Sequence, residues 1–420
     1  MISSGYHYEG GCPTLASCAR VGTTDPYTRA SEPRSSSRPA LPALSRMAMI
    51  LCLLATAQAQ VAKKIVGYYY GKGRPAYQLS DVPAQKLTHL IYSHARPTAQ
   101  GDCALAHPDV DTPNLLGLKR LRAQNQHLLV LLSVGGWSGS RYFSDVAASS
   151  AAREHFSGSC LRAVAEYRLD GLDIDWEYPV TGGKPADHKR TADKENFVLL
   201  LKQLRRDLDT FGHGRHLLLT IASTGYRDHL SDLSLKEMAG VLDWFNLMGY
   251  DFNEMQTRFT SHHSGLFAWP ANAKLNADAV KYANSDAAVR WYMDHGVPSE
   301  KIVLGVPFYG QVWANVPDEN HGLYAPYEGR PGEEGTLSYR EIEQTHLPVC
   351  TRYWDDQVKV PWLYNKATKI MISYEDSESV AEKAKYVIQN RLGGMMFWDL
   401  GQDDDKSTLL EAIHRQLDGD

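Results

Sequence analysis

The stretch Asp170-Gly171-Leu172-Asp173-Ile174-Asp175-Trp176-Glu177-Tyr178-Pro179 carries an acid at every second position from residue 173. Side chains of a β-strand point alternately to its two faces, so Asp173, Asp175 and Glu177 share one face. The large apolar residues between them take the other face. This alternation predicts a strand that packs its apolar side under helices and carries three carboxylates on the opposite side.

Other short runs with strand character recur along the chain and alternate with longer segments of helical character. Most are continuously apolar, which is typical of parallel strands covered on both faces. The expected strands are Ile65–Tyr69, His89–His94, Leu128–Val134, Gly171–Trp176, Leu217–Ser223, Trp244–Tyr250, Ile302–Pro307 and Gly394–Trp398. The expected helices include Ala152–Tyr167, Asp193–Asp209, Ser285–His295 and Ser377–Asn390. This order predicts an α/β fold, a (β/α)8 TIM barrel. The alternative is a doubly wound open sheet, but no strand is followed by a glycine-rich phosphate turn.

The interval from Pro307 to Met395 is far longer than a loop and one helix require. The segments Leu323–Tyr327, Thr336–Gln344 and Trp362–Tyr374 within it have strand or helix patterns. We therefore expect a small α+β insertion after the seventh strand, at about residues 312–375. At the C-terminal mouth of a barrel, such an insertion would build one wall of a cleft.

The apolar face of the acidic strand packs under helices, so its carboxylates must point into the barrel. Stacked carboxylates in a poorly solvated interior repel, so at least one should hold a proton near neutral pH. A carboxylic acid kept protonated in this way suits general acid catalysis, and Glu177 is the one nearest the mouth. A solvated edge strand, a calcium loop and a magnesium site are the alternatives. The flanking helical segments disfavour the first, and large apolar residues in the gaps disfavour the second.

The spacing of the acids also restricts the reaction. Conventional glycosidases place two carboxyl groups on opposite sides of the scissile bond, about 5–5.5 Å apart for retention and about 6.5–9.5 Å apart for inversion. Asp175 and Glu177 rise from one face of one strand and cannot straddle a sugar. If the protein is a glycosidase, its nucleophile comes from elsewhere, and the substrate's own 2-acetamido oxygen would serve.

Four motifs together resemble family-18 glycoside hydrolases, the chitinase family. The acidic stretch fits the family pattern D-x-x-D-x-D-x-E, and Ser133-Val134-Gly135-Gly136-Trp137 resembles its S-x-G-G motif. Met248-Gly249-Tyr250-Asp251 fits M-x-Y-D, and Gly394-Met395-Met396-Phe397-Trp398 resembles the closing tryptophan strand. Their order agrees over about residues 64–415. The chain is most similar to compact secreted bacterial chitinases.

The resemblance implies a role for each matching residue. Glu177 would protonate the leaving oxygen, and Asp175 would orient the acetamido N–H and offset the charge of an oxazolinium intermediate. Asp173 would share a proton with Asp175, helped by Ser133, and Tyr250 would donate to the acetamido oxygen. The remaining substrate-binding candidates are Tyr68, Trp137, Tyr178, Met248, Asp251, Tyr309 and Trp398, with Trp398 as the floor of the pocket. Asp170 lies off the acidic face, so a structural role is expected.

Two positions depart from the family pattern. Phe308-Tyr309-Gly310-Gln311 has an amide where the family commonly shows the arginine of F-Y-G-R. The second strand reads Ile91-Tyr92-Ser93-His94-Ala95, where many relatives have N-Y-A-F-A. Both changes are expected to alter contacts with the substrate, and neither removes a group from the proposed chemistry.

Composition is that of an ordinary globular protein, with 43% hydrophobic and 22% charged residues among 420. A net charge of −5 gives no basic surface for nucleic acid. We expect neither a cofactor nor a metal. The adjacent His262 and His263 lie in a polar loop and lack the spacing of a zinc site, and Asp403-Asp404-Asp405 is expected to be a solvated loop. Trp313 fits a sugar platform and core packing equally well.

The N-terminal region is expected to be no part of the fold. Residues 1–46 have no hydrophobic period and indicate a disordered or non-native extension. The run from Met47 to Ala57 and the sequence Ala57-Gln58-Ala59 indicate a signal peptide at residues 47–59, too short to span a membrane; a buried helix is the alternative. The mature chain, from about Gln60, would be a secreted or periplasmic catalytic barrel over residues 60–420. It keeps Cys103, Cys160 and Cys350, which allow one disulfide at most.

The function predicted from the sequence is a chitinase that acts as a monomer on chitin or chito-oligosaccharides. An endo-β-N-acetylglucosaminidase acting on N-glycans is the alternative among enzymes, and the Trp-Glu-Tyr-Pro ending and the insertion favour the chitinase. A non-catalytic chitin-binding lectin is the alternative of another class. Such lectins usually lack the terminal acid, which is present here as Glu177.

Overall fold

The computed structural model describes residues 62–419, apart from 74–75, 256–257, 271–273 and 333. The expected extension, signal peptide and cleavage site therefore lie outside the described residues and stay predictions. No helix in the described ranges is long and apolar enough to cross a membrane.

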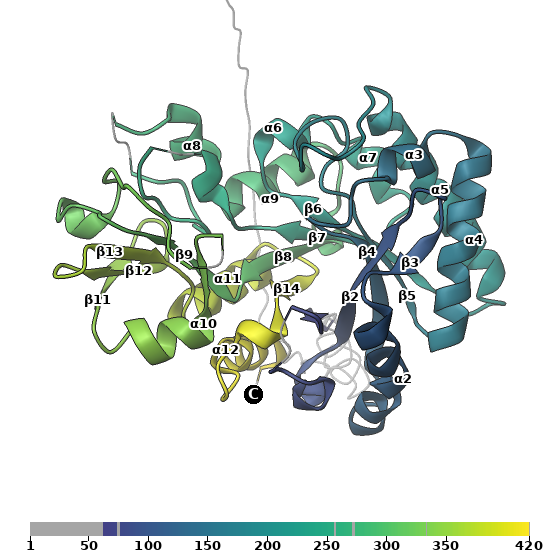
Figure 1. Ribbon diagram of the computed structural model, residues 1–420, viewed down its shortest axis with the longest axis horizontal. Helices are drawn as coiled ribbons and strands as arrows, with labels where there is room; N and C mark the ends of the chain where they lie inside the picture. Colours follow the sequence, from purple (N-terminus) through teal and green to yellow (C-terminus); the bar gives the residue numbers. More distant parts are fainter. Residues whose placement is uncertain (1–61, 74–75, 256–257, 271–273, 333, 420) are drawn as a thin grey trace, which may run out of the picture. The chain divides into compact units, whose positions relative to one another are not determined.

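In the described part of the chain, eight parallel strands form a closed barrel, because β1 pairs with both β14 and β2 (Figure 1). They are β1 (Lys64–Tyr70), β2 (His89–Pro97), β4 (Leu129–Gly135), β5 (Gly171–Asp175), β6 (Leu218–Thr224), β7 (Trp244–Met248), β8 (Ile302–Pro307) and β14 (Gly394–Trp398). All eight expected strands are confirmed, with shifts of one to three residues at some ends. The predicted TIM barrel is therefore correct.

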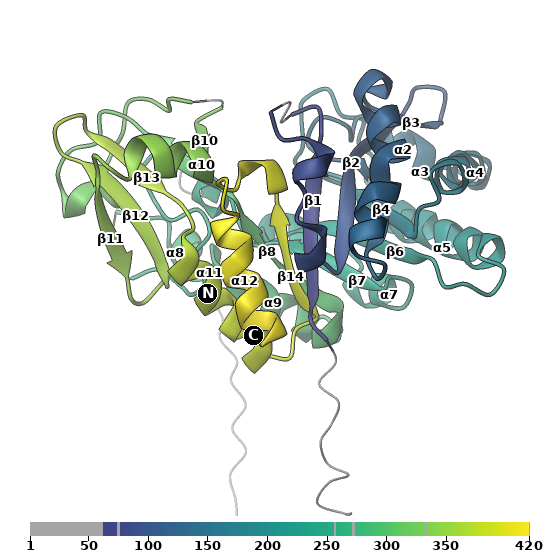
Figure 2. The same cartoon turned by 90° about the horizontal axis from the view of Figure 1, so that it is seen from below.

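Helices follow the strands and cover the outside of the barrel (Figure 2). They are α2 (Pro108–Gln124), α3 (Phe143–Ala147), α4 (Ser150–Tyr167), α5 (Asp193–Phe211), α6 (Arg227–Leu230), α7 (Leu235–Ala239), α9 (Ser285–Asp294), α11 (Ser377–Gln389) and α12 (Thr408–Asp418). The short helix α8 (Ala277–Tyr282) packs instead against the second sheet described below. The short strand β3 (Cys103–Leu105) extends the sheet antiparallel to β2. The outer faces of the strands pack under these helices, so Leu172, Ile174 and Trp176 of the acidic stretch join the main apolar core.

A second, antiparallel sheet occupies the long interval after β8. Its strand order is β10-β9-β13-β12-β11, and its five strands within the described residues are β9 (Tyr309–Trp313), β10 (Thr336–Ser338), β11 (Thr351–Asp355), β12 (Val360–Asn365) and β13 (Ile370–Ser373). The helix α10 (Tyr339–Glu341) follows β10. The sheet thus begins directly after β8, slightly before the expected residue 312. The expected element at Leu323–Tyr327 is wrong as a strand, because these residues make only an isolated bridge from Pro326 to Phe259.

The second sheet has its own apolar core. Trp313 is 1% exposed and lies in this core, which rules out the sugar-platform alternative for that residue. Phe252 and Trp269, from the connection after β7, pack into the same core. This shared core ties the connection after β7 to the second sheet, so both segments border the C-terminal end of the barrel.

Several polar residues expected at the surface are buried instead. His262 and His263 are each 0% exposed, and the Nε2 atom of His262 lies 3.1 Å from Asp355 Oδ2. No cluster of metal-ligating residues is found in the described ranges. The Asp403 carboxylate accepts hydrogen bonds from the backbone N–H groups of Leu409 and Leu410 at the start of α12. The Asp404 carboxylate accepts a hydrogen bond from the Thr408 N–H. The expectation of a solvated loop at 403–405 was therefore wrong for Asp403 and Asp404, which are buried and accept hydrogen bonds from the helix N-terminus.

The three cysteines of the described chain have free thiols. Cys160 is fully buried, and burial together with a hydrogen bond to the Cys103 thiol raises its pKa well above the usual range.

Candidate active site

The acidic strand places its carboxylates as its alternation requires. Asp173 and Asp175 point into the barrel from β5, where they are 0% and 4% exposed. Glu177 follows the strand end and lines a cleft of about 630 Å³ together with Asp175. Asp170 lies outside this face, where its carboxylate accepts hydrogen bonds from Arg122 and the Val130 N–H. This confirms its expected structural role.

Asp173 forms the base of the carboxylate stack and is held by donors from three other strands. Tyr68 donates its hydroxyl proton to Oδ2 at 2.7 Å, and Thr220 and Asn246 donate to Oδ1 at 2.5 and 3.1 Å. Burial raises the Asp173 pKa to about 6, although these three hydrogen bonds oppose the rise. Tyr68 was expected to line the substrate pocket; it does so and also fixes Asp173.

Asp175 and Glu177 form a coupled pair above Asp173. Burial, followed by the charges of Glu177 and Asp173, raises the Asp175 pKa well above its usual range. Burial raises the Glu177 pKa to about 7, while a hydrogen bond with Asp175 opposes the rise. The pair therefore holds at least one proton at neutral pH, which the two carboxyl groups share through a hydrogen bond. The Oδ1 atom of Asp175 is buried and accepts no hydrogen bond from any described residue.

Glycines at the end of β4 allow the backbone to pass close to this pair. The Gly136 N–H donates to the Asp175 carbonyl at 2.8 Å. A Cβ atom at Gly135 would lie 2.1 Å from the Asp175 carbonyl oxygen, and the φ angle of Gly135 is +120°. Only glycine fits there, which gives the Gly135-Gly136 pair a physical reason.

Ser133 was expected to assist Asp173 and Asp175, and the structure corrects this. Its hydroxyl lies 3.0 Å from His94 Nδ1, and no hydrogen bond to a carboxylate is found in the described ranges. The sequence shows that His94 replaces an apolar residue of the family pattern, but not that its ring contacts Ser133. His94 stacks on Trp398 with ring centroids 5.4 Å apart, and burial lowers its pKa to about 3. It therefore contributes a neutral ring to the pocket.

The cleft contains nearly all other predicted site residues. Tyr250, Asp251 and Met248 reach it from the end of β7, Tyr309 from β9, Trp137 from the end of β4 and Trp398 from β14. Tyr178 also lines the cleft, and its ring stacks on the His229 ring with centroids 4.6 Å apart. Trp137 is 45% exposed, which is unusual for such a large ring and suits a flat sugar face.

His94 and Gln311, the two departures from the family pattern, also line the cleft. Sequence reasoning missed the cleft residues Tyr70, Arg96, His107, Tyr226, His229, Glu254 and Arg330. His107, Tyr226 and Arg330 come from loops, whose approach to the cleft has no local pattern. Thr220 and Asn246 were also missed, although each is a polar residue within a strand that is otherwise largely apolar. That signal could have identified them as inward-facing partners of the acids.

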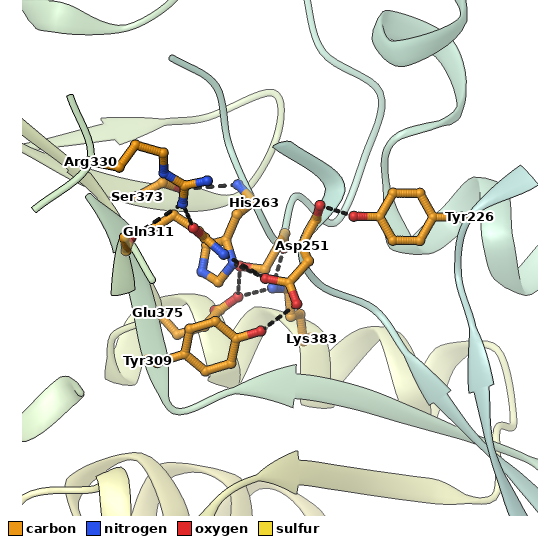
Figure 3. A network of polar contacts seen from close by, with 11 residues as sticks. Tyr226, Asp251, His263, Tyr309, Gln311, Arg330, Ser373, Glu375 and Lys383 are labelled. Carbon is orange, nitrogen blue, oxygen red and sulfur yellow. Dashed lines mark hydrogen bonds and ion pairs between the residues drawn. The ribbon is translucent and has the colours of Figure 1, made fainter. Parts of the chain in front are cut away.

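Asp251 is the centre of a second polar network (Figure 3). Tyr309 donates to Oδ2 at 2.6 Å and Gln311 donates to Oδ1 at 2.7 Å, while the Tyr226 hydroxyl donates to its carbonyl. Burial alone would raise the Asp251 pKa, but the neighbouring His263 and these two donors hold it below the usual value. Asp251 is therefore ionised and both of its oxygens are engaged.

The sequence matches the family described as Glycosyl hydrolases family 18 over residues 64–403. The chain belongs to this family. It is 36% identical over 420 aligned residues to Chitinase A1 of Niallia circulans, covering 86% of this chain and 60% of that protein. The chain thus spans about 60% of the length of that relative.

Solved structures of similar proteins agree with this assignment. Chitinase ChiA74 from Bacillus thuringiensis superposes with a TM-score of 0.78 at 32% identity, covering 85% of this chain and 70% of that one. A family 18 N-acetylglucosaminidase from Paenibacillus barengoltzii gives a TM-score of 0.74 at 33% identity, covering 84% and 99%. The protein is therefore a glycoside hydrolase.

The pKa of Glu177 predicts how stability depends on pH in this family 18 protein. Because the folded state binds the Glu177 proton more tightly than the unfolded chain, stability falls as pH rises from about 4.5 to about 7. Gln has no proton to lose, so E177Q escapes this loss. The free energy of unfolding of E177Q minus that of wild type should therefore be about 1–3 kcal/mol more favourable to E177Q at pH 8 than at pH 4. Urea unfolding at several pH values measures this. The exposed Glu166 on α4, changed to Gln, is the matched control. An E177Q difference that does not vary with pH would contradict the burial account.

Proposed function

We propose that this family 18 hydrolase cleaves β-1,4-linked N-acetylglucosamine polymers, chitin or chito-oligosaccharides, by a retaining, substrate-assisted mechanism. The observation that carries the proposal is the coupled pair of Asp175 and Glu177 at the base of an aromatic cleft. The two acids share a proton there, and Asp175 Oδ1, a buried carboxylate oxygen, has no hydrogen-bond partner among the described residues. All the groups invoked come from one chain, so a monomer suffices.

Glu177 is the general acid and base of this proposal. It lines the cleft, and a pKa of about 7 keeps much of it protonated at neutral pH. A pKa near the working pH is favourable both for giving a proton to the leaving oxygen and for taking one from water. The backbone N–H of Glu177 donates to Ser140 Oγ at 2.9 Å, which fixes the chain where the acid leaves the strand.

Three described acids that line the cleft beside Glu177, namely Asp175, Asp251 and Glu254, are poorly suited to act as the nucleophile. Asp175 lies on the same strand face as Glu177, so it cannot attack the opposite side of the sugar. Both oxygens of Asp251 already accept hydrogen bonds, from Tyr309 and Gln311. Burial raises the pKa of Glu254, a further cleft acid, to about 7, which weakens it as a nucleophile. The acetamido oxygen of the substrate is then the nucleophile, and its attack forms a cyclic oxazolinium ion.

Asp175 and Tyr250 would hold the two ends of the acetamido group. The Oδ1 atom of Asp175 is available to accept the amide N–H. The Tyr250 hydroxyl stays protonated, because burial and the charges of Asp251 and Asp175 raise its pKa well above 10. It can therefore donate to the acetamido oxygen and orient its attack. Asp173 supports Asp175 from below and stabilises its protonated form through its own negative charge.

Aromatic side chains would hold the sugar rings. Trp398 has Tyr68, Tyr70 and His94 around it at centroid distances of 5.4–5.8 Å, which gives an apolar floor beside the acids. Trp137 at the mouth offers a platform on the leaving side. Two similar proteins are named chitinases, which supports a chitin substrate. Another is named an N-acetylglucosaminidase, so the size of the released product is a quantity to measure. The alternative is an endo-β-N-acetylglucosaminidase, which would release glycans from glycoproteins and leave chito-oligosaccharides intact. The presence of the acid Glu177 disfavours the other alternative, a non-catalytic chitin-binding lectin.

Changing Glu177 to Gln should abolish turnover of chito-oligosaccharides while binding is retained. The amide keeps the shape of the acid but cannot give a proton, so kcat should fall at least about 10²–10⁴-fold. Glu254→Gln is the matched comparison, since it removes a second cleft acid with a pKa of about 7 and should cost less than about tenfold. Product analysis by chromatography and calorimetric binding measure the two effects. Near-normal turnover in E177Q would assign the acid to another residue.

Export is a further part of the proposal, because the predicted signal sequence at residues 47–59 precedes the barrel. N-terminal sequencing of the exported protein should give a start near Gln60. Exported protein that retains residues 20–40 would contradict the assignment of residues 47–59 as a cleaved signal peptide.

A further inference from the structure

The cation that family 18 commonly has in F-Y-G-R is absent at Gln311, yet a guanidinium reaches the same place from elsewhere. Arg330 lies in the connection between β9 and β10, lines the cleft, and donates from Nη2 to Gln311 Oε1 (Figure 3). Gln311 is buried and donates from Nε2 to Asp251 Oδ1 at 2.7 Å. The amide therefore stands between a cation and an anion.

The Gln311 amide accepts a hydrogen bond from a cation at its oxygen and donates one to an anion from its nitrogen. Its oxygen meets the guanidinium, and its N–H meets the carboxylate, so the two charges together fix which way the amide is turned. Among the described residues, no lysine or arginine forms an ion pair with Asp251, and the His263 ring is 3.7 Å away. Without Arg330, the amide oxygen would lose the partner that opposes a flip. A flip would put oxygen against the Asp251 carboxylate.

Arg330 is itself held in place by the insertion. Its guanidinium lies 5.5 Å from the centre of the Trp313 ring, and Nη2 also donates to the Gly335 carbonyl at 3.2 Å. Trp313 is part of the buried core of the second sheet. The position of this cation is thus set by the insertion and not by the barrel strands.

Asp251 transmits this arrangement to the reacting group. It follows Tyr250 directly and has a left-handed backbone with φ of +60°, a conformation that non-glycine residues hold only when neighbours fix it. Its carbonyl and both carboxylate oxygens are engaged, by Tyr226, Tyr309 and Gln311. Loss of one of these contacts would loosen the turn that presents the Tyr250 hydroxyl.

We propose that Arg330 is a positioning residue that replaces the missing arginine through Gln311 and holds Asp251, and with it Tyr250, in the reactive arrangement. This inference rests on the proposed function, in which Tyr250 orients the acetamido group. It assigns a role in turnover to the connection between β9 and β10, a part of the insertion that the proposed mechanism does not otherwise use.

The test is a double-mutant cycle measured on whichever oligosaccharide the wild-type protein cleaves. Arg330→Met keeps an apolar chain over Trp313 and removes the charge, so kcat should fall about 10–100-fold with little change in KM. Adding Gln311→Arg to that variant places a guanidinium next to Asp251 and should restore most of kcat. Gln311→Arg alone should lower kcat, because two cations then face each other. Arg340→Met, in the same insertion but outside the cleft-lining residues, is the control and should leave kcat unchanged.

Two results would overturn the inference: wild-type kcat in Arg330→Met, or a loss that Gln311→Arg does not restore although the variant melts like wild type. If Arg330→Met does not fold, Gln311→Met breaks the same relay at its centre and should lower kcat equally; wild-type kcat there would also overturn it. Wild-type protein that cleaves no N-acetylglucosamine oligosaccharide would refute the proposed function instead, whatever the variants do.

Discussion

Burial of three carboxylates inside one barrel is the physical constraint on which the site depends. Charges in a poorly solvated interior are costly unless they are neutralised or receive hydrogen bonds. The protein uses both solutions at different depths. Asp173, at the base, receives hydrogen bonds from three other strands, whereas Asp175 and Glu177 share a proton at the mouth. The gradient from hydrogen-bonded anion to protonated acid is what gives Glu177 its chemistry.

In the second network, the pKa of the carboxylate of Asp251 is lowered, whereas the pKa values of Asp175 and Glu177 are raised. Here donors hold the pKa below its usual value, so the residue stays ionised and has a structural task. Two acids in one cleft thus have different protonation because their partners differ. Close to this network, Lys383 and Glu375 form an ion pair with side chains that are each 0% exposed (Figure 3). Ser264 and Ser379 also donate hydrogen bonds to Glu375. The ion pair and the additional hydrogen bonds to Glu375 make such burial tolerable.

Much of the fold followed from sequence periodicity, because a strand buried on both faces must be continuously apolar and an acidic strand must alternate. The face of Asp173 and Asp175, the structural role of Asp170 and all eight strands were predictable for this reason. Contacts between distant segments were not. The pairing of Ser133 with His94, the buried state of His263, the helix-capping Asp403 and the approach of Arg330 to Gln311 depend on loop paths that no local pattern records. Thr220 and Asn246 lie between these cases, since a polar residue in a largely apolar strand is visible in sequence but its partner is not.

Attack by the acetamido oxygen of the substrate is the central claim, and the anomeric form of the first product tests it most directly. Proton NMR during early hydrolysis of a chito-oligosaccharide should show the β anomer first, since water opens the oxazolinium ion from the face that the leaving group occupied. The same experiment on an oligomer with a glucosamine unit before the scissile bond should show no cleavage there. The α anomer as the first product, or efficient cleavage after the glucosamine unit, would contradict the account.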